Sequence, residues 1–423
     1  MMNKLLPMSV LAALVSTSAY SKPIDLEYWS LLSGGDGTRM SVLVDGFNNS
    51  QSDYHINTTI LPWGEPFYTK LKTSVHVGSG PDIATIHLSK ISGMVKDKDL
   101  YAFAPKTLEQ YHYDQGNIFP RLLEQATREG KVYALPLDTH ALVLYYNKVI
   151  LQQAGVIGDD GKLPEITNME QFDTILKSVA QNTDKQGLSM ESNPNSYMGY
   201  RLWQSMVIQM GGKVMEGDKY VFGNKGEKAL SAISNWFANG YSTKNLDYVA
   251  STTEFMTGNS AFMINGVWEV PTLQAKKAEG ETQFGIAPIP SFYNGNQSVW
   301  ADSHALAIPN NAGKPLSDEK LKGIMEFANY INEHAIEWGK GGHIPAYAPE
   351  VDTPAYQSLP FVRDFATTTA ENIVYDPDGW YNGAAGPMQA SAAKFLPAAL
   401  TGQLSVEDAL KRYERDSRKF INK

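Results

Sequence analysis

The sequence predicts an α/β protein of two lobes that are interleaved along the chain, each built on a mostly parallel sheet flanked by helices. Three observations support this prediction. Strands and helices alternate near the start, polar residues interrupt an apolar stretch at 132–148, and two later stretches are interrupted in a similar way. The chain has 423 residues, 43% of them apolar and 19% charged, which suits two or more domains with sizeable cores.

The first lobe is predicted from its alternation of strands and helices. Apolar side chains between Met40 and Phe47 recur at helical spacing, and Pro66 suits the first turn of a second helix. Strands are expected at residues 24–28, 56–60 and 82–86. This order is typical of a βαβαβ unit with a parallel sheet.

Unusual residues stand at the carboxyl ends of these three strands. Trp29, Trp63 and His87 each occupy such an end, where open α/β sheets bind their ligands. The loop that contains Gly35 and Asp36 precedes a helix N-terminus, which could cradle an anion. The alternative interpretation is that each tryptophan covers an edge of the core and that the glycines only shape the loop.

A hinge crossing is predicted within VYALPLDTHALVLYYNK, residues 132–148. Pro136 removes a ladder donor and favours extended backbone before it, so the pattern indicates strand, kink and strand. A chain that leaves one sheet at a kink and enters another crosses between lobes, which would place Asp138 and His140 in the cleft. A single buried strand with an edge bulge is the alternative.

Similar interruptions follow Trp300 and surround His343, so we expect three crossings. They divide the chain into an N-terminal lobe of residues 22–138 and 303–345 and a C-terminal lobe of residues 139–302 and 346–423. The last helix is expected to start at Ser405 and to belong to the second lobe.

The start of the chain is typical of a cleavable signal peptide. Lys4 precedes an apolar segment at residues 8–15, and small residues precede Lys22. We therefore expect residues 1–21 to be removed on export.

The chain has no cysteine, which excludes disulfides, thiol catalysis and a lipid-modified cysteine. The expected product is a soluble monomer, free in a bacterial periplasm. Its net charge of −9 argues against nucleic acid as a partner.

No motif for catalysis, a cofactor or a metal is present in the sequence. A phosphate-binding glycine loop, a dinucleotide fingerprint, HExxH and GxSxG are all missing. The eight histidines lack the spacing of metal ligands. A glycosidase would need two suitably separated carboxylates. The candidates for such a pair are Glu65, Asp138, Glu269 and Asp302.

Tryptophan is the positive signal. Five of the eight tryptophans lie in polar loops that contain Gly or Pro, which are Trp29, Trp63, Trp268, Trp300 and Trp380. A flat indole suits the apolar face of a pyranose ring, and nearby Asp, Glu, Asn or His side chains can bind its hydroxyls. Packing at the edge of the core is the alternative for each tryptophan taken singly.

Several motifs together resemble the family 1 solute-binding proteins of ABC importers, the maltodextrin- and oligosaccharide-type receptors. These motifs are PDIA at 81–84, Pro136-Leu137-Asp138 followed by LVLYYNK, GNSAFM at 258–263 running to Trp268, and Ile344-Pro345-Ala346. The resemblance implies a periplasmic-binding-protein (Venus flytrap) fold with three hinge crossings. It also implies a receptor that closes around sugar and then docks on a membrane permease.

The predicted function is therefore carbohydrate binding for an ABC importer, without catalysis, metal or cofactor. The predicted ligand-binding residues are Trp29, Gly35, Asp36, Trp63, Glu65, His87, Asp138, His140, Trp203, Trp268, Trp300, Asp302, His343 and Trp380. A neutral di- or oligosaccharide is expected because the candidate cleft loops contain few basic residues, with Arg39 and Arg201 the nearest. The alternatives are a receptor for an acidic sugar or a glycerol phosphate-type ligand, and a secreted glycoside hydrolase.

Overall fold

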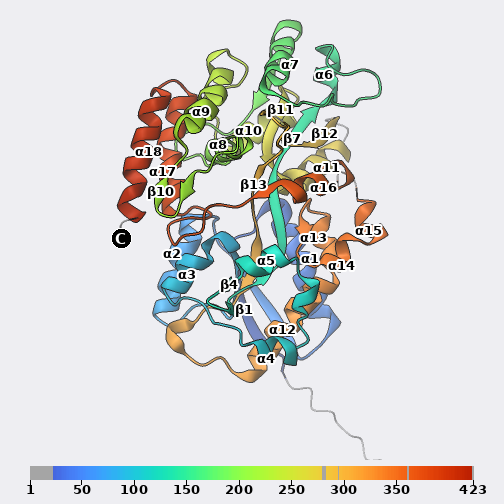
Figure 1. Cartoon of the computed structure of the whole chain (residues 1–423). Coiled ribbons are helices and arrows are strands. Elements are labelled where there is room, and N and C mark those ends of the chain that lie inside the picture. Colours follow the sequence, from blue (N-terminus) through green and yellow to red (C-terminus); the bar gives the residue numbers. More distant parts are fainter. Residues whose placement is uncertain (1–21, 279–282, 294, 360–361, 422–423) are drawn as a thin grey trace, which may run out of the picture.

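The computed structural model describes residues 22–278, 283–293, 295–359 and 362–421. The predicted signal peptide, residues 1–21, lies outside the described residues. Two lobes, each with its own sheet and its own hydrophobic clusters, are stacked end to end (Figure 1). The two-lobed α/β architecture expected from the sequence is confirmed.

The first lobe contains a five-stranded sheet in the order β2-β1-β3-β14-β6. Its strands are β1 (Ile24–Ser30), β2 (Tyr54–Ile60), β3 (Ile83–His87), β6 (Leu135–Pro136) and β14 (His304–Ala307). The predicted parallel order is present in β2-β1-β3. Strand β14 is antiparallel to both of its neighbours, because the chain enters it on the way back from the other lobe.

Helices cover this sheet at the positions that the apolar spacing predicts. Met40, Leu43 and Phe47 are buried on one face of the first helix. The helical segments of this lobe are α1 (Gly34–Ser50), α2 (Glu65–His76), η1 (Leu88–Lys90), α3 (Ile91–Lys96), α4 (Pro105–Gln110), η2 (Gln115–Asn117), α5 (Pro120–Gln125), η4 (Asn311–Gly313), α12 (Asp318–Glu333) and α13 (Ala335–Gly339). A small hairpin joins β4 (Thr127–Arg128) and β5 (Lys131–Val132).

The second lobe has a seven-stranded sheet arranged around one long strand. Its strands are β7 (Asp138–Asn147), β8 (Gln186–Ser189), β11 (Ser260–Gly266), β12 (Phe284–Pro288), β13 (Val299–Asp302), β15 (Ile344–Pro345) and β16 (Ile373–Val374). The prediction of a mostly parallel sheet is wrong for this lobe, because β7 enters from the first lobe and runs antiparallel to β11, β12, β13 and β15.

The helices of the second lobe surround this mixed sheet. They are α6 (Lys148–Gln153), α7 (Met169–Asn182), α8 (Met198–Gln209), α9 (Gly223–Ala238), α10 (Tyr248–Met256), η3 (Val267–Glu269), α11 (Val270–Ala278), α14 (Ala348–Val351), α15 (Pro354–Gln357), α16 (Val362–Asn372), α17 (Pro387–Leu400) and α18 (Val406–Ile421), with a hairpin of β9 (Met215–Glu216) and β10 (Lys219–Tyr220). In the described part of the chain, no helix combines the length and the apolar character that a membrane span requires.

Three chain segments join the lobes and bond to one another. The N–H of Leu137 donates to the carbonyl of His304 (2.8 Å), and the N–H of Ala346 donates to the carbonyl of Leu137 (2.9 Å). These bonds bring the three predicted crossings side by side. The sheet memberships of β6, β7, β13 and β14 support lobe boundaries near 138 and 303, which we retain as a proposal.

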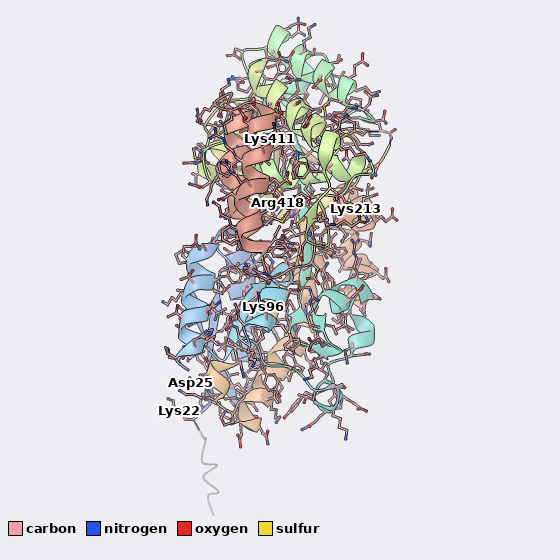
Figure 2. All side chains as sticks on the ribbon, turned by 60° about the vertical axis from the view of Figure 1, so that its left-hand side comes forward. Lys22, Asp25, Lys96, Lys213, Lys411 and Arg418 are labelled. Carbon is pink, nitrogen blue, oxygen red and sulfur yellow. The ribbon has the colours of Figure 1, made fainter. Side chains whose placement is uncertain are left out.

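The lobes also touch away from the hinge, through segment 375–386 of the second lobe. Asp378 accepts hydrogen bonds from Arg128 (3.0 Å) and Ser92 in the first lobe. The ammonium of Lys96 lies 4.2 Å from the ring centre of Trp380, at the junction of the lobes in Figure 2. Trp380 therefore lies at the lobe interface and is not part of the cavity lining between the lobes.

Trp203, a predicted ligand-binding residue, lies in the core of the second lobe. Its side chain is fully buried, it packs against Phe222 and Tyr413, and its indole N–H donates to the carbonyl of Gly226 (2.9 Å). The reason is its position on α8, where it faces α9 and α18. A tryptophan with these contacts stabilises the lobe and does not reach a ligand.

We predict that Trp203→Ala lowers the free energy of unfolding by about 3–5 kcal/mol, because it removes a large side chain from a closed core. Trp63→Ala, at a tryptophan that is 37% exposed, should cost less than about 1 kcal/mol. Urea unfolding of both variants followed by circular dichroism measures this contrast. Equal losses at the two positions would contradict the placement of Trp203.

Candidate functional site

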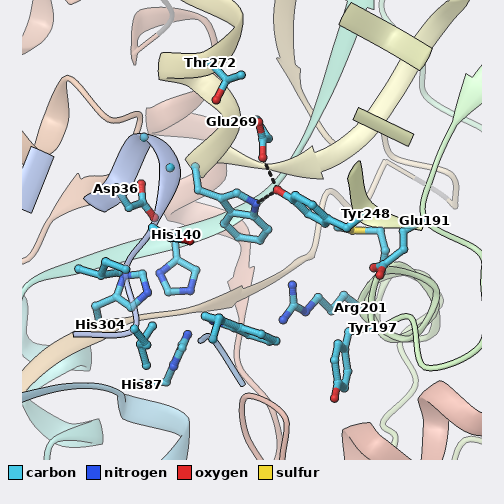
Figure 3. Close-up of a pocket in the computed structure, with 18 of the residues that line it drawn as sticks. Asp36, His87, His140, Glu191, Tyr197, Arg201, Tyr248, Glu269, Thr272 and His304 are labelled. Carbon is cyan, nitrogen blue, oxygen red and sulfur yellow. Dashed lines mark hydrogen bonds between the residues drawn. The ribbon is translucent and has the colours of Figure 1, made fainter. Parts of the chain in front are cut away.

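A cavity of about 470 Å³ lies between the lobes, within the range of small-molecule sites. Figure 3 shows its lining. The first lobe contributes Leu31–Asp36, Trp63, His87 and His304, and the second lobe contributes His140, Glu191, Tyr197, Met198, Arg201, Tyr248, Trp268, Glu269, Thr272 and Trp300. Both lobes therefore contact any molecule bound there.

The first-lobe wall is formed where strands β1, β2 and β3 end. The loop after β1 leads into α1, Trp63 follows β2, and His87 is the last residue of β3. A Cβ at Gly35 would lie 2.9 Å from the ring of Pro271 on α11, so a glycine is needed for the two lobes to approach here. Of the three residues predicted at strand ends, Trp63 and His87 line the cavity and Trp29 does not.

Aromatic side chains form much of the second-lobe wall. The indole N–H of Trp268 donates to the hydroxyl of Tyr248 (2.8 Å), which in turn donates to Glu269 (Figure 3). A Cβ at Gly266 would fall 2.1 Å from the Trp268 ring, so this ring position requires glycine there. Across the cavity, Trp63 meets Tyr197 edge to face with ring centres 5.8 Å apart.

Arg201 projects from α8 into this aromatic wall. Its guanidinium carbon lies 4.2 Å from the ring centre of Trp300, 5.7 Å from that of Trp268 and 5.8 Å from that of Trp63. The residue is only 6% exposed. Burial lowers the pKa of Arg201 from its usual value, although a guanidinium keeps its charge in proteins.

Behind the cavity, the fully buried carboxylate of Asp138 gathers donors from all three crossings. It accepts from the backbone N–H (2.8 Å) and Nδ1 (2.8 Å) of His304, from Nε1 of Trp338 (2.6 Å) and from Nδ1 of His140 (3.1 Å). Nδ1 of His343 lies 2.8 Å away, at ion-pair distance but not aligned as a hydrogen bond. Burial alone would raise the pKa of Asp138, but the three histidines hold it well below its usual range.

The same carboxylate fixes how two histidines face the cavity. Because Nδ1 of His140 and of His304 each contact an anionic acceptor, Nδ1 must donate, which leaves Nε2 of a neutral ring as an acceptor. Burial and the neighbouring His304 lower the pKa of His140 to about 4, so this ring is neutral at pH 7. Nε2 of His140 thus offers a lone pair to a hydroxyl donor at the cavity wall.

His343 connects the hinge to the cavity. Its Nε2 lies 2.8 Å from Oδ1 of Asp36, in the first turn of α1, while its Nδ1 faces Asp138. Burial opposes its charge, but the two carboxylates outweigh this effect and raise the pKa of His343 to about 10. A charged imidazole therefore bridges a cavity residue and the hinge carboxylate.

Half of the predicted ligand-binding residues line the cavity, namely Gly35, Asp36, Trp63, His87, His140, Trp268 and Trp300. Asp138, Asp302 and His343 are almost completely buried behind it. Trp29 lies beneath the ammonium of Lys70 (5.2 Å) and packs on the core of the first lobe. Glu65 is exposed at the start of α2. Trp203 and Trp380 lie elsewhere, as described above.

The sequence prediction missed several lining residues, chiefly Glu191, Tyr197, Arg201, Tyr248, Thr272 and His304. His304 immediately follows the predicted second crossing, so the argument that selected Asp138 and His140 could have found it. The others lie on or beside α8, α10 and α11, and no local pattern separates them from ordinary helical residues.

Four histidines that are scattered along the sequence converge in the structure. Ligand-type atoms of Asp138, His140, His304 and His343 lie within 4.8 Å of one another, as do those of His87, His140 and Asp302. By type and spacing either group could hold a metal ion. However, both oxygens of Asp138 already accept hydrogen bonds, which describes a hinge network better than an open coordination sphere.

Comparison with known proteins gives one family. Residues 43–360 match the family model described as bacterial extracellular solute-binding protein. The maltodextrin-binding protein MdxE of Bacillus subtilis is 27% identical over 327 residues, covering 71% of this chain and 73% of that protein. The sn-glycerol-3-phosphate-binding periplasmic protein UgpB of Brucella abortus is 22% identical over 389 residues, covering 85% of each chain.

Solved structures share the fold. The GacH receptor of Streptomyces glaucescens, crystallised without ligand and with acarbose, superposes with a TM-score of 0.80 at 18% identity, covering 95% of this chain and 99% of the receptor chain. At this identity the likeness establishes the two-lobed architecture.

We predict that the His343 bridge makes stability depend on pH. The unfolded chain releases this proton near pH 6.5 and the folded chain near pH 10, so the folded state holds the extra proton between these values. The stabilisation is complete below about pH 6.5 and is lost as the pH rises towards 10. Urea midpoints of the wild type and of His343→Gln, measured from pH 6.5 to 10, should therefore converge. A constant difference between the two proteins across this range would contradict the bridge.

Proposed function

The chain belongs to the family of bacterial extracellular solute-binding proteins, and we propose that it captures a carbohydrate for an ABC importer. The observation that supports this proposal best is the cavity between the lobes, where indole rings and polar side chains from both lobes meet. Aromatic planes suit the apolar faces of pyranose rings, while Asp36, Glu269 and the histidines suit their hydroxyls.

The position of the cavity supports capture by closure. A ligand there contacts the first lobe through Asp36 and His87 and the second through Trp268 and Tyr248. Such a ligand binds the closed form better than the open form, and this difference in affinity shifts the hinge equilibrium towards closure. The contacts of segment 375–386 with the first lobe would then stabilise the closed state further.

A di- or oligosaccharide is the ligand class that we propose. The names of relatives point in two directions, to maltodextrin for MdxE and to sn-glycerol 3-phosphate for UgpB. Exposed tryptophan faces favour the sugar, because a glycerol backbone has no flat apolar face to stack on an indole. The glycerol phosphate-type alternative therefore ranks second.

A glycoside hydrolase is the rival of another class. Of its four candidate carboxylates, only Glu269 lines the cavity. Asp138 and Asp302 are almost completely buried and accept hydrogen bonds from neighbouring groups, and Glu65 lies outside the cavity. The lining contains two further acids, which are Asp36, whose Oδ1 lies 2.8 Å from Nε2 of His343, and Glu191, which precedes α8. We therefore propose a receptor without catalytic turnover.

The remaining features of the proposal follow from the family and from the sequence. We propose that the mature protein starts near Lys22, remains in the periplasm as a monomer, and docks transiently on the transmembrane subunits of the importer. The lobes would be residues 22–138 with 303–345 and residues 139–302 with 346–423. Closure would bring the two lobe surfaces into the relative position that the permease recognises.

A thermal-shift screen of the mature protein against mono-, di- and oligosaccharides and glycerol phosphates tests the function. A ligand that binds only the folded state must raise the melting temperature in a saturable way. We expect a shift with a sugar and no product on chromatography. A saturable shift only with glycerol phosphates would contradict the proposal that the ligand is a sugar. Conversion of a sugar to product would contradict the proposal that the protein is a receptor without catalytic activity.

We predict that Trp268→Ala weakens binding of the sugar found in this screen by about 10- to 100-fold, because it removes an anchoring aromatic plane. Isothermal titration calorimetry measures the dissociation constant. Trp29→Ala is the matched control, since Trp29 lies outside the cavity lining, and it should leave affinity within about twofold of the wild type. Similar losses in both variants would refute the role of Trp268.

A further inference from the structure

Arg201 is a buried charge without a polar partner. Among the described residues its guanidinium makes no hydrogen bond and no ion pair, and Nε is buried with no acceptor. Arg201 is only 6% exposed, and Figure 3 shows its side chain extending into the cavity. A buried donor left unpaired is costly, so this fork is poised for an acceptor that arrives with the ligand.

Its aromatic contacts position the fork without satisfying it. The guanidinium lies 4.2 Å from the ring centre of Trp300 and is near Trp63 and Trp268. Stacking uses the flat face of the guanidinium and leaves its in-plane N–H groups free. The three indoles therefore orient the donors, while the hydrogen bonds remain unmade.

The nearby acids are already engaged with other donors. Asp376 accepts from Nε1 of Trp300 (3.2 Å) and from Gln389 (2.6 Å), and Asp302 accepts from Ser89 (2.5 Å). Both act on Arg201 only through space, as does Glu191. The N–H groups at the start of α8 bond to Glu191. Among the described residues, no carboxylate thus serves as the direct partner of the guanidinium N–H groups.

We propose that the ligand supplies this partner as a carboxylate, and that the sugar taken up contains a uronic acid residue held by paired N–H groups of Arg201. This inference rests on the proposed function and makes it more specific. It replaces the expectation of a neutral sugar, which assumed that basic residues are scarce in the cleft. The structure brings Arg201 from α8 into the cleft.

The charge of the site favours a carboxylate over a phosphate. A guanidinium matches a planar carboxylate in a bidentate pair and offsets a single charge. A phosphate monoester carries about −1.5 to −2 at pH 7 and would need further cationic donors. Arg201 is the cationic side chain that lines the cavity, and Glu191 and Glu269 line it too. A dianion would face their repulsion.

The experiment compares the affinities of sugars that have nearly the same shape but differ in charge. Mature protein is titrated by calorimetry with uronate-bearing di- and trisaccharides, each beside its methyl ester, and with neutral and 6-phosphorylated counterparts. We expect at least one uronate to bind about tenfold or more tighter than its ester, because only the acid forms the charged pair. This comparison needs no variant.

The variants assign the preference to one side chain. Arg201→Met should weaken binding of the preferred uronate by about 100-fold or more and abolish the preference over its ester. Arg201→Lys keeps the positive charge but not the paired N–H donors, so its affinity for the uronate should lie between those of the wild type and Arg201→Met. Arg418→Met is the matched control, since Arg418 also lies over a ring, that of Tyr220 (5.9 Å), on the outer face of α18 (Figure 2). Melting temperatures check that each variant folds.

Each other outcome overturns the inference. Neutral sugars binding as well as uronates would show that Arg201 serves hydroxyls, and the proposed function would stand. Tighter binding of the 6-phosphorylated sugars than of the uronates would show that the partner of Arg201 is a phosphate and not a carboxylate. If no sugar of any kind binds, both the proposed function and the inference of a uronate ligand are wrong. A preference for acid that survives in Arg201→Met would assign the charge selection to another group.

Discussion

The carboxylate of Asp138 contacts donors from each of the three segments that join the lobes. His140 follows it on the first segment, His304 begins β14 after the second, and Trp338 and His343 precede the third. A buried carboxylate without such donors would cost several kcal/mol. The folded hinge therefore requires all three segments to be in place together, although the first lies more than 150 residues before the other two in sequence.

The same contacts shape the ligand cavity. Asp138 contacts Nδ1 of His140 and Nδ1 of His304, and both rings line the cavity. Through His343 it is also linked to Asp36, in the first turn of α1. The hinge and the cavity wall thus share one network of hydrogen bonds and ion pairs, which connects the crossings to side chains that line the cavity.

The sequence predicts the hinge and part of the wall for identifiable reasons. Pro136 and the polar residues after it mark a crossing, and Trp63 and His87 stand at strand ends. Tryptophan in a polar loop was a weaker guide, because Trp29 packs on a core and Trp380 at the lobe interface. Arg201, Tyr197 and Tyr248 enter the cavity only through the placement of α8 and α10 against the other lobe, which is tertiary information that no local pattern contains.

The three indoles around Arg201 cannot all stack on sugar. Trp300 is 1% exposed, bonds to Asp376 through its N–H and lies closest to the guanidinium, so its exposed surface is too small for a pyranose face. Trp63 is 37% exposed, and Trp268 is partly exposed. We therefore propose that Trp63 in the first lobe and Trp268 in the second stack on the sugar, while Trp300 contacts the guanidinium of Arg201. This division places an apolar surface on each lobe and the charge between them.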